Sequence, residues 1–349
     1  MSNSKPKIRV DWNYFLYMSL IRCVNRKLFL LHSIHKTEFL TLNLERRRCI
    51  VSRPLTQRTD ASRPAPLIGS HAQVTPTKIN AAEPTMDHLD ELEAQSIYIF
   101  REAFARLKKL ALLWSLGKDS NVMIWLARKA FFGRVPFPVI HLDTEAEFPE
   151  AYAFRHHYAR EWGLTLIADP CPPIETVDPT LPPASRFAAR KSEGLKRCLA
   201  QHRFAGLIAG IRRDEQSIRA KERVFSPRGA DGSWDFRNQP PEFWDQYIAA
   251  PGPGTHMRIH PLLSWTEVDI WRYIAREQIP VVPLYFSKDG YRYRSLGEVG
   301  TTAPVASNAD TVEQIIAELE STRAAERGGR LMDHEAEDVF ERLRANGYL

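Results

Sequence analysis

The chain has 349 residues, 44% of them hydrophobic, so it can bury a sizeable core, and its length is typical of two domains. The formal net charge is +6, but the positive excess lies in residues 1–85, where 14 Lys and Arg face 5 Asp and Glu. Residues 86–349 hold 34 Lys and Arg against 37 Asp and Glu. The basic composition therefore gives no support to nucleic-acid binding by the main part of the chain.

Residues 1–85 are predicted to be a disordered basic extension, or sequence upstream of the true start at Met86. The stretch 52–85 is rich in Pro, Ser and Thr, which is typical of disorder. The apolar run Tyr14–Ile21 is too short to span a bilayer, and no signal peptide is recognisable. We therefore expect no membrane insertion, and a basic targeting or membrane-surface segment stays open as the alternative.

A helix is predicted over Leu89–Leu110, because apolar residues recur there at helical spacing between charged ones. Short apolar runs then alternate with helical stretches, and we interpret these runs as strands. The predicted strands are residues 111–114, 139–142, 164–168 and 207–209. This alternation predicts an α/β fold with a doubly wound, mainly parallel sheet over 86–230 and a less regular C-terminal region over 231–349.

The segment Ser115-Leu-Gly-Lys-Asp-Ser120 connects the first predicted strand to a predicted helix over 121–132. A loop at a helix N-terminus directs backbone N–H groups and the positive end of the helix dipole toward one point, which suits a phosphate group. Gly117 permits close approach, Ser115 and Ser120 offer hydroxyls, and Lys118 adds a positive charge. The alternative is an ordinary strand-to-helix turn in which Ser120 caps the helix.

This loop resembles the pyrophosphate-binding loop of the adenine nucleotide α-hydrolase (PP-loop) superfamily, usually Ser-Gly-Gly-x-Asp-Ser. Leu116 replaces the first glycine, so we expect Gly117 alone to turn the loop. Further segments resemble, in order, the small ATP-pyrophosphatase subunits of bacterial sulfate adenylyltransferases. These segments are Val139–Thr144, Phe148–Glu150, Gly210–Arg223, Trp234–Trp244, Arg258–Leu262, Trp265–Trp271, Ile279–Phe286, Arg294–Gly297 and Glu326–Asp333.

The resemblance implies a reaction of ATP with sulfate that gives adenosine 5′-phosphosulfate and pyrophosphate. Its equilibrium lies strongly toward ATP, so the resemblance also implies a separate, larger GTPase subunit that supplies energy. Residues 86–230 would form the nucleotide-binding core, and 231–349 would complete the site and the partner interface. ATP is the expected nucleotide, with Mg²⁺ bound mainly by its phosphates and water.

Site residues follow from the loop and from the basic segment after the fourth strand. Pyrophosphate is expected to bind at Ser115, Gly117, Lys118, Asp119 and Ser120, and the nucleotide also at Asp143 and Thr144.

Sulfate and the α-phosphate are expected to bind beside four basic residues of the segment after the fourth strand, since guanidinium groups match tetrahedral oxyanions. These residues are Arg212, Arg213, Arg219 and Lys221. Lys118, Arg212 and Arg219 are the expected catalytic groups. Arg212 and Arg219 lie seven residues apart, which would place them on one helical face. Asp119 either holds Mg²⁺ or braces the loop.

The four cysteines are scattered without CxxC spacing, which fits a reducing cytoplasm and predicts neither a zinc site nor a disulfide framework. The alternative function is a related PP-loop enzyme, either a sulfonucleotide reductase or a tRNA-modifying ATP pyrophosphatase. Such reductases use a cysteine near the C-terminus, and no Cys follows Cys198 in this sequence. The missing nucleophile disfavours that alternative.

Several other polar and aromatic residues are expected to be structural. His141 and His260 are interpreted as buried histidines, and Glu298 stands where the family commonly has Cys. Aromatic residues of the C-terminal half are expected in the core or at an interface; these are Trp234, Trp244, Trp265, Trp271 and Tyr273.

Overall fold

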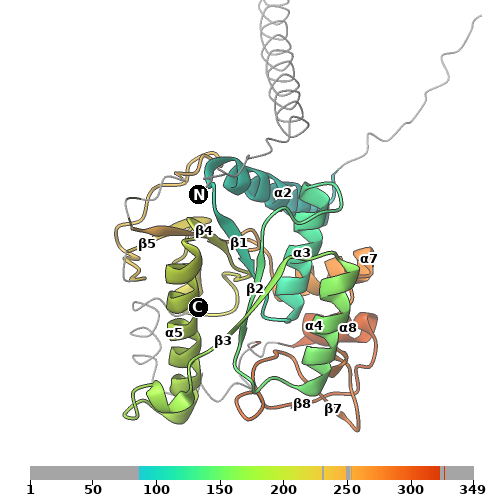
Figure 1. Cartoon of the computed structure of the whole chain (residues 1–349). Helices are drawn as coiled ribbons and strands as arrows, with labels where there is room; N and C mark the ends of the chain where they lie inside the picture. Colours follow the sequence, from blue (N-terminus) through green and yellow to red (C-terminus); the bar gives the residue numbers. More distant parts are fainter. Residues whose placement is uncertain (1–85, 230–231, 249–251, 253, 323–325, 327–349) are drawn as a thin grey trace, which may run out of the picture. The chain divides into compact units, whose positions relative to one another are not determined.

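The structure is a computed structural model that describes residues 86–229, 232–248, 252, 254–322 and 326 (Figure 1). The extension predicted over 1–85 and most of the Glu326–Asp333 segment lie outside the described residues. All of the described residues belong to one compact unit.

A six-stranded sheet forms the centre of this unit, in the order β3-β2-β1-β4-β6-β5. Its strands are β1 (Leu110–Leu113), β2 (Val139–Asp143), β3 (Leu166–Pro170), β4 (Gly206–Ile208), β5 (Phe225–Arg228) and β6 (His256–Ile259). All neighbours are parallel except β5 and β6, which pair antiparallel at one edge. The predicted α/β class and the mainly parallel sheet are confirmed, with strand boundaries shifted by one or two residues.

Helices cover both faces of the sheet because the strands are apolar on both sides (Figure 1). Leu110 and Leu112 of β1 belong to a large core that includes residues of five helices, whereas Ala111 and Leu113 face α5 (Pro183–His202) on the other side of the sheet. The five helices are α2 (His88–Arg106), α3 (Lys118–Ala130), α4 (Pro149–Glu161), α7 (Glu267–Glu277) and α8 (Val312–Ser321).

The C-terminal region packs on the same core and is less regular, as predicted. Helix α8 (Val312–Ser321) contributes Ile315 and Leu319 and lies beside α7. The remaining elements are short: η1 (Ile174–Thr176), α6 (Ser217–Ala220), η2 (Pro283–Tyr285), and the antiparallel pair β7 (Tyr291–Arg292) and β8 (Val305–Ala306). Strand β6 lies between β4 and β5, so residues on both sides of position 230 build one sheet.

Local sequence explains where three of the helices begin. Asp87 and Asp90 form a capping box at the start of α2, and Thr266 and Asp269 form another at the start of α7. Helix α4 begins with Pro149, whose fixed φ and missing N–H suit a first helical position. None of the helices in the described part of the chain is long and apolar enough to cross a membrane.

Aromatic residues are buried as expected, with one exception. Trp265, Trp271, Tyr273 and Trp234 are buried, and the first three belong to the large core. Trp244 is 90% exposed, so it does not lie in the core, and the expected position at an interface stays a prediction for this residue. Its segment, 236–248, contains no helix or strand among its described residues and runs over the surface.

The loop between β1 and α3 is turned by Leu116, with a φ of 62°, whereas Gly117 has an ordinary φ of −73°. The expectation that Gly117 alone turns the loop is therefore wrong. A non-glycine residue in the left-handed region costs about 1–2 kcal/mol. The Leu116 side chain is buried in the large core, and its packing offsets this cost.

Two substitutions separate the backbone cost at position 116 from the packing. Leu116→Ala and Leu116→Gly both remove the buried side chain and should destabilise the protein by roughly 2–4 kcal/mol. Only the glycine relieves the left-handed φ, so we expect Leu116→Gly to be the more stable variant by about 1 kcal/mol. Urea unfolding of both variants measures the difference. An alanine variant at least as stable as the glycine variant would contradict the account.

Candidate functional site

A cleft opens where the chain reverses direction across the sheet. In the sheet, β2 and β3 lie on one side of β1, whereas β4 lies on its other side. The carboxyl ends of β1 and β4 therefore flank the topological switch point, which is where ligands bind in open α/β sheets. The lining comes from Ser115, residues 117–120, 209–211 and 295–297, and from Leu113, Glu147, Lys191, Glu215, Arg219, Tyr285 and Glu326. The structure thus brings the predicted loop and Arg219 to one cleft.

The first turn of α3 presents backbone to this cleft. Gly117 is the N-cap residue, and no side chain caps the helix there. The backbone N–H of Lys118 donates to the Tyr285 hydroxyl at 2.9 Å, and the Ser120 hydroxyl donates to the carbonyl oxygen of Gly117 at 2.8 Å. The positive end of the helix dipole therefore faces the cleft, which favours an anion at this position.

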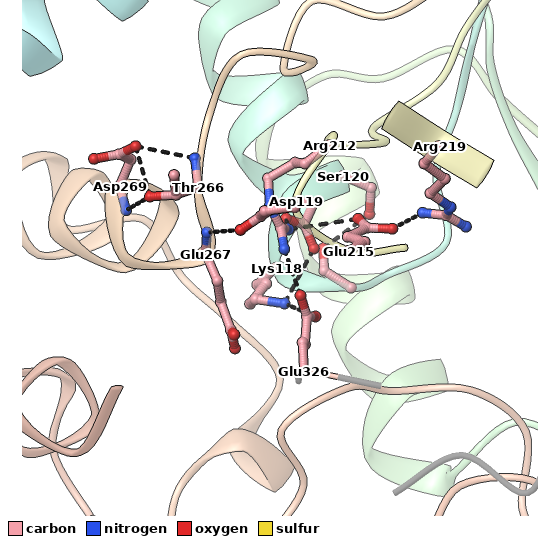
Figure 2. A network of polar contacts seen from close by, with 12 residues as sticks. Lys118, Asp119, Ser120, Arg212, Glu215, Arg219, Thr266, Glu267, Asp269 and Glu326 are labelled. Carbon is pink, nitrogen blue, oxygen red and sulfur yellow. Dashed lines mark hydrogen bonds and ion pairs between the residues drawn. The ribbon is translucent and has the colours of Figure 1, made fainter. Parts of the chain in front are cut away.

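Lys118 is buried in the wall of the cleft, with 1% of its side chain exposed. Its ammonium group lies 3.2 Å from a carboxylate oxygen of Asp119 and also contacts Glu326 (Figure 2). Burial alone lowers the pKa of Lys118, but the charges of Asp119 and Glu326 outweigh that effect and raise the pKa above its ordinary value. Lys118 is a permanent cation in this environment.

Arg212 lies behind Lys118 and is completely buried. Its guanidinium group contacts Asp119 and Glu326, and its Nε donates to Asp214 at 2.9 Å (Figure 2). Asp214 also accepts the backbone N–H of Glu267 at 2.8 Å, which connects the first residue of α7 to the same network. Glu215 lies 3.5 Å from the guanidinium group of Arg212 as well, so four carboxylates surround two buried cations, a pairing that buried charges require.

Arg219 projects into the cleft from the short helix α6 and forms an ion pair with Glu215 (Figure 2). The expectation that Arg212 and Arg219 share a helical face is wrong, because the helix spans only four residues and Arg212 precedes it in a loop. The sequence Arg213–Gln216 forms a turn in which Asp214 and Glu215 neutralise the two arginines. Loop geometry and charge pairing, not helical spacing, bring Arg212 and Arg219 together.

Arg213 and Lys221 are not part of the cleft lining. Arg213 is exposed and its Nη1 donates to the Ser264 hydroxyl at 3.3 Å. Lys221 is exposed as well, and its ammonium group lies 4.9 Å from the centre of the Phe236 ring. Their expected contact with an anion finds no support in this geometry.

Asp143 is the last residue of β2 and Thr144 follows it, but neither residue lines the cleft. The Asp143 carboxylate accepts hydrogen bonds from Arg155 at 2.6 Å, from Tyr152 at 2.8 Å and from the backbone of Glu145 at 2.9 Å. Thr144 is buried, and its hydroxyl has no hydrogen-bond partner within the described part of the chain. A nucleotide role for these two residues stays a prediction.

The wall opposite the loop contains residues that sequence reasoning did not assign. The Lys191 ammonium group lies 3.0 Å from Glu298 and 3.6 Å from Glu147, and it joins α5 to the C-terminal region. Glu298 is buried at the position where the family commonly has Cys. Tyr285 and Glu326 were also missed as site residues, although both lie in segments that carry the family resemblance.

The expected role of Asp119 as a metal ligand meets a competing interaction. Both carboxylate oxygens of Asp119 are paired, one with Arg212 and one with Lys118. Among the described residues, no group of three or more His, Cys, Asp or Glu side chains could hold a metal ion. The described residues therefore do not fit a resident Mg²⁺, and the geometry favours Asp119 as a brace of the loop.

His141 and His260 are buried, as expected of structural histidines. Nδ1 of His141 lies 3.0 Å from the carbonyl oxygen of Trp114, and Nδ1 of His260 lies 2.8 Å from that of Arg223. Burial lowers the pKa of both imidazoles, that of His260 to about 4. Both rings are neutral near pH 7 and hold loops against the ends of β1 and β6.

The bonds to Asp143 predict a pH dependence of stability. Burial alone raises the pKa of this carboxyl group, but the hydrogen bonds, led by that of Arg155, lower it from 3.8 to about 2. Because the pKa is lower in the folded state, the bonded carboxylate stabilises the protein above pH 3.8, and this contribution is lost as the pH falls toward 2.

Asp143→Asn removes the titration, so we expect the difference in unfolding free energy between wild type and variant to shrink as the pH falls from about 5 to about 2. Urea unfolding of both proteins at a series of pH values measures this difference. A difference that stays constant over that range would mean that Asp143 does not stabilise the fold through its charge.

Comparisons with known proteins agree with this architecture. Residues 109–304 match the phosphoadenosine phosphosulfate reductase domain family. Sulfate adenylyltransferase subunit 2 of Rhizobium johnstonii is 40% identical over 302 residues, which cover 77% of this chain and 95% of that protein. The protein of the same name from Stutzerimonas stutzeri is 41% identical over 300 residues, which cover 75% and 98%.

Among solved structures, FMN adenylyltransferase of Candida glabrata in complex with FAD and pyrophosphate is 18% identical to this chain. The match covers 62% of this chain and 64% of that one, with a TM-score of 0.43, so it bears on neither substrate nor mechanism. The two curated relatives align over nearly their whole length at 40% identity or more. The chain belongs to the family of sulfate adenylyltransferase subunit 2.

Proposed function

We propose that this chain is the nucleotide-binding subunit of a sulfate adenylyltransferase, which converts ATP and sulfate into adenosine 5′-phosphosulfate and pyrophosphate. The observation that supports this most directly is the first turn of α3, which faces the cleft beside Lys118. The similarity to sulfate adenylyltransferase subunit 2, which extends over nearly the whole length of those relatives, supports sulfate as the substrate. The reaction needs two anions to meet, so the site must neutralise charge on both.

The first turn of α3 would hold the β- and γ-phosphates of ATP. Backbone N–H groups of this turn would be the donors, and Lys118 adds a permanent positive charge. The hydroxyls of Ser115 and Ser120, which in this structure donate to Ser120 and to the carbonyl oxygen of Gly117, would turn toward the phosphates. Negative charge grows on pyrophosphate as it departs from the α-phosphorus. Donors already aimed at that position stabilise the transition state more than the bound ATP.

Sulfate and the α-phosphate would lie on the side of the cleft that Arg219 lines. A planar guanidinium donates two parallel hydrogen bonds to one oxyanion, and Arg212 lies close behind to support the same charge. Of the four expected cations, Arg219 lines the cleft, Arg212 lies behind Lys118 and does not line it, and Arg213 and Lys221 lie outside it. Mg²⁺ would arrive with ATP as part of the substrate, bound by phosphates and water.

The buried cysteines support adenylyl transfer over sulfur reduction. Burial raises the pKa of the Cys171 thiol to about 11 and that of the Cys198 thiol to about 12. A thiol with such a pKa is protonated at neutral pH and is a poor nucleophile. Neither of these two cysteines of the described region lines the cleft.

The family name, subunit 2, implies a partner subunit, and we propose that this partner is a GTPase of the cytoplasm. GTP hydrolysis would drive a reaction whose equilibrium favours ATP. Large apolar side chains gather on the exposed segment 236–248, where Phe243 is 64%, Trp244 90% and Ile248 52% exposed. Such a patch is typical of a protein interface, so this segment is the proposed contact with the partner.

Pyrophosphate exchange tests the proposed function. The full chain with its partner should incorporate labelled pyrophosphate into ATP, and the rate should depend on sulfate. Lys118→Ala should lower this rate by about 10²–10³-fold, the usual effect of losing one aligned donor, and should lower the thermal midpoint far less.

Lys196→Ala is the matched control, because Lys196 pairs with Glu193 on the outer surface of α5. We expect it to leave exchange unchanged. An exchange rate that does not depend on sulfate would reject sulfate as the substrate. An exchange rate of the Lys118→Ala variant equal to that of wild type would show that the loop is not part of the site.

A further inference from the structure

Glu326 places a carboxylate at the anion-binding end of the cleft. One of its oxygens contacts the ammonium group of Lys118 and the other contacts the guanidinium group of Arg212 (Figure 2). Glu326 also lines the cleft itself, together with the loop. A negative side chain therefore lies beside both cations that a phosphate would approach.

The charges around Glu326 do not need a further carboxylate for balance. Lys118, Arg212 and Arg219 together carry three positive charges, and Asp119, Asp214 and Glu215 already provide three negative charges in contact with them. Glu326 adds a fourth carboxylate, so this connected set carries a net charge of −1. A polyanion that enters next to an uncompensated carboxylate is repelled, and the repulsion is strong where water is excluded.

We propose that Glu326 is an internal counter-anion, which competes with the pyrophosphate part of ATP for Lys118 and Arg212 and leaves both cations when ATP binds. This inference rests on the proposed function. Exchange of one anion for another keeps both buried cations paired in either state, so neither state leaves a charge alone. Binding of ATP and the contacts of Glu326 with the two cations are therefore coupled, each weakening the other to the same extent.

The proposal also explains why every nitrogen of the Arg212 guanidinium group contacts a carboxylate in this structure. Departure of Glu326 frees the Nη2 donor of Arg212 while Nη1 and Nε stay paired with Asp119 and Asp214. A fixed guanidinium with one free donor is then aimed at the bound nucleotide. The cost of breaking the contacts of Glu326 is part of the measured affinity for ATP.

Glu326→Gln tests the proposal, because it removes the charge and keeps the shape. By calorimetry, the full chain carrying Glu326→Gln should bind pyrophosphate and ATP about tenfold more tightly than wild type, since about 1.4 kcal/mol of competition is lost. AMP lacks the β- and γ-phosphates, so its affinity should not change. Glu313→Gln on the exposed start of α8 is the matched control and should bind all three like wild type.

Weaker or unchanged pyrophosphate binding by Glu326→Gln, with wild-type binding intact, would overturn the counter-anion role and leave the proposed function standing. Wild-type protein that binds neither ATP nor pyrophosphate would overturn both. Hydrogen exchange of the wild type supplies a readout that does not depend on the variant's folding. Pyrophosphate should speed amide exchange of the peptide that contains residue 326, and unchanged or slower exchange would reject the displacement.

Discussion

The pairing of two buried cations is the constraint on which the site depends. Lys118 and Arg212 lie within the wall of the cleft with almost no access to water, and either one left unpaired would cost several kcal/mol. The partners come from distant parts of the chain: Asp119 from α3, Asp214 from the loop after β4, and Glu326 from the C-terminal region. The need to neutralise charge thus draws separate segments to one point, and Asp214 extends this connection to α7.

Sheet topology determines where that point lies. The chain leaves β1 toward β2 and β3 and returns to β4 on the other side, so two loops diverge at adjacent strand ends. One loop starts α3 and the other carries Arg212 and Arg219, which places a helix dipole and two guanidinium groups around one cleft. Packing of the strands on both faces keeps this rim rigid, and a rigid rim favours donors that need no rearrangement during reaction.

The sequence was sufficient for the parts of this architecture that depend on local pattern. Apolar runs located β1, β2 and β4 within about a residue, and the hexapeptide located the first turn of α3. Contacts between residues far apart in the chain could not be predicted from the sequence. Leu116 adopts a left-handed φ because its side chain packs in the core, and a six-residue motif contains no information on that packing. Arg212 and Arg219 pair with Asp214 and Glu215 in a turn, although their spacing in the sequence is also that of one helical face. Glu326 was overlooked because its charge opposes the expected ligand.

A structure of the full chain with a non-hydrolysable ATP analogue and sulfate tests the central claim most directly. The account predicts β- and γ-phosphates at the first turn of α3 in contact with Lys118, and the α-phosphate and sulfate on the side of Arg219. It also predicts that the carboxylate of Glu326 has left Lys118 and Arg212. Phosphates bound away from the Ser115–Ser120 loop, or a triphosphate bound there with Glu326 still in contact with both cations, would contradict it.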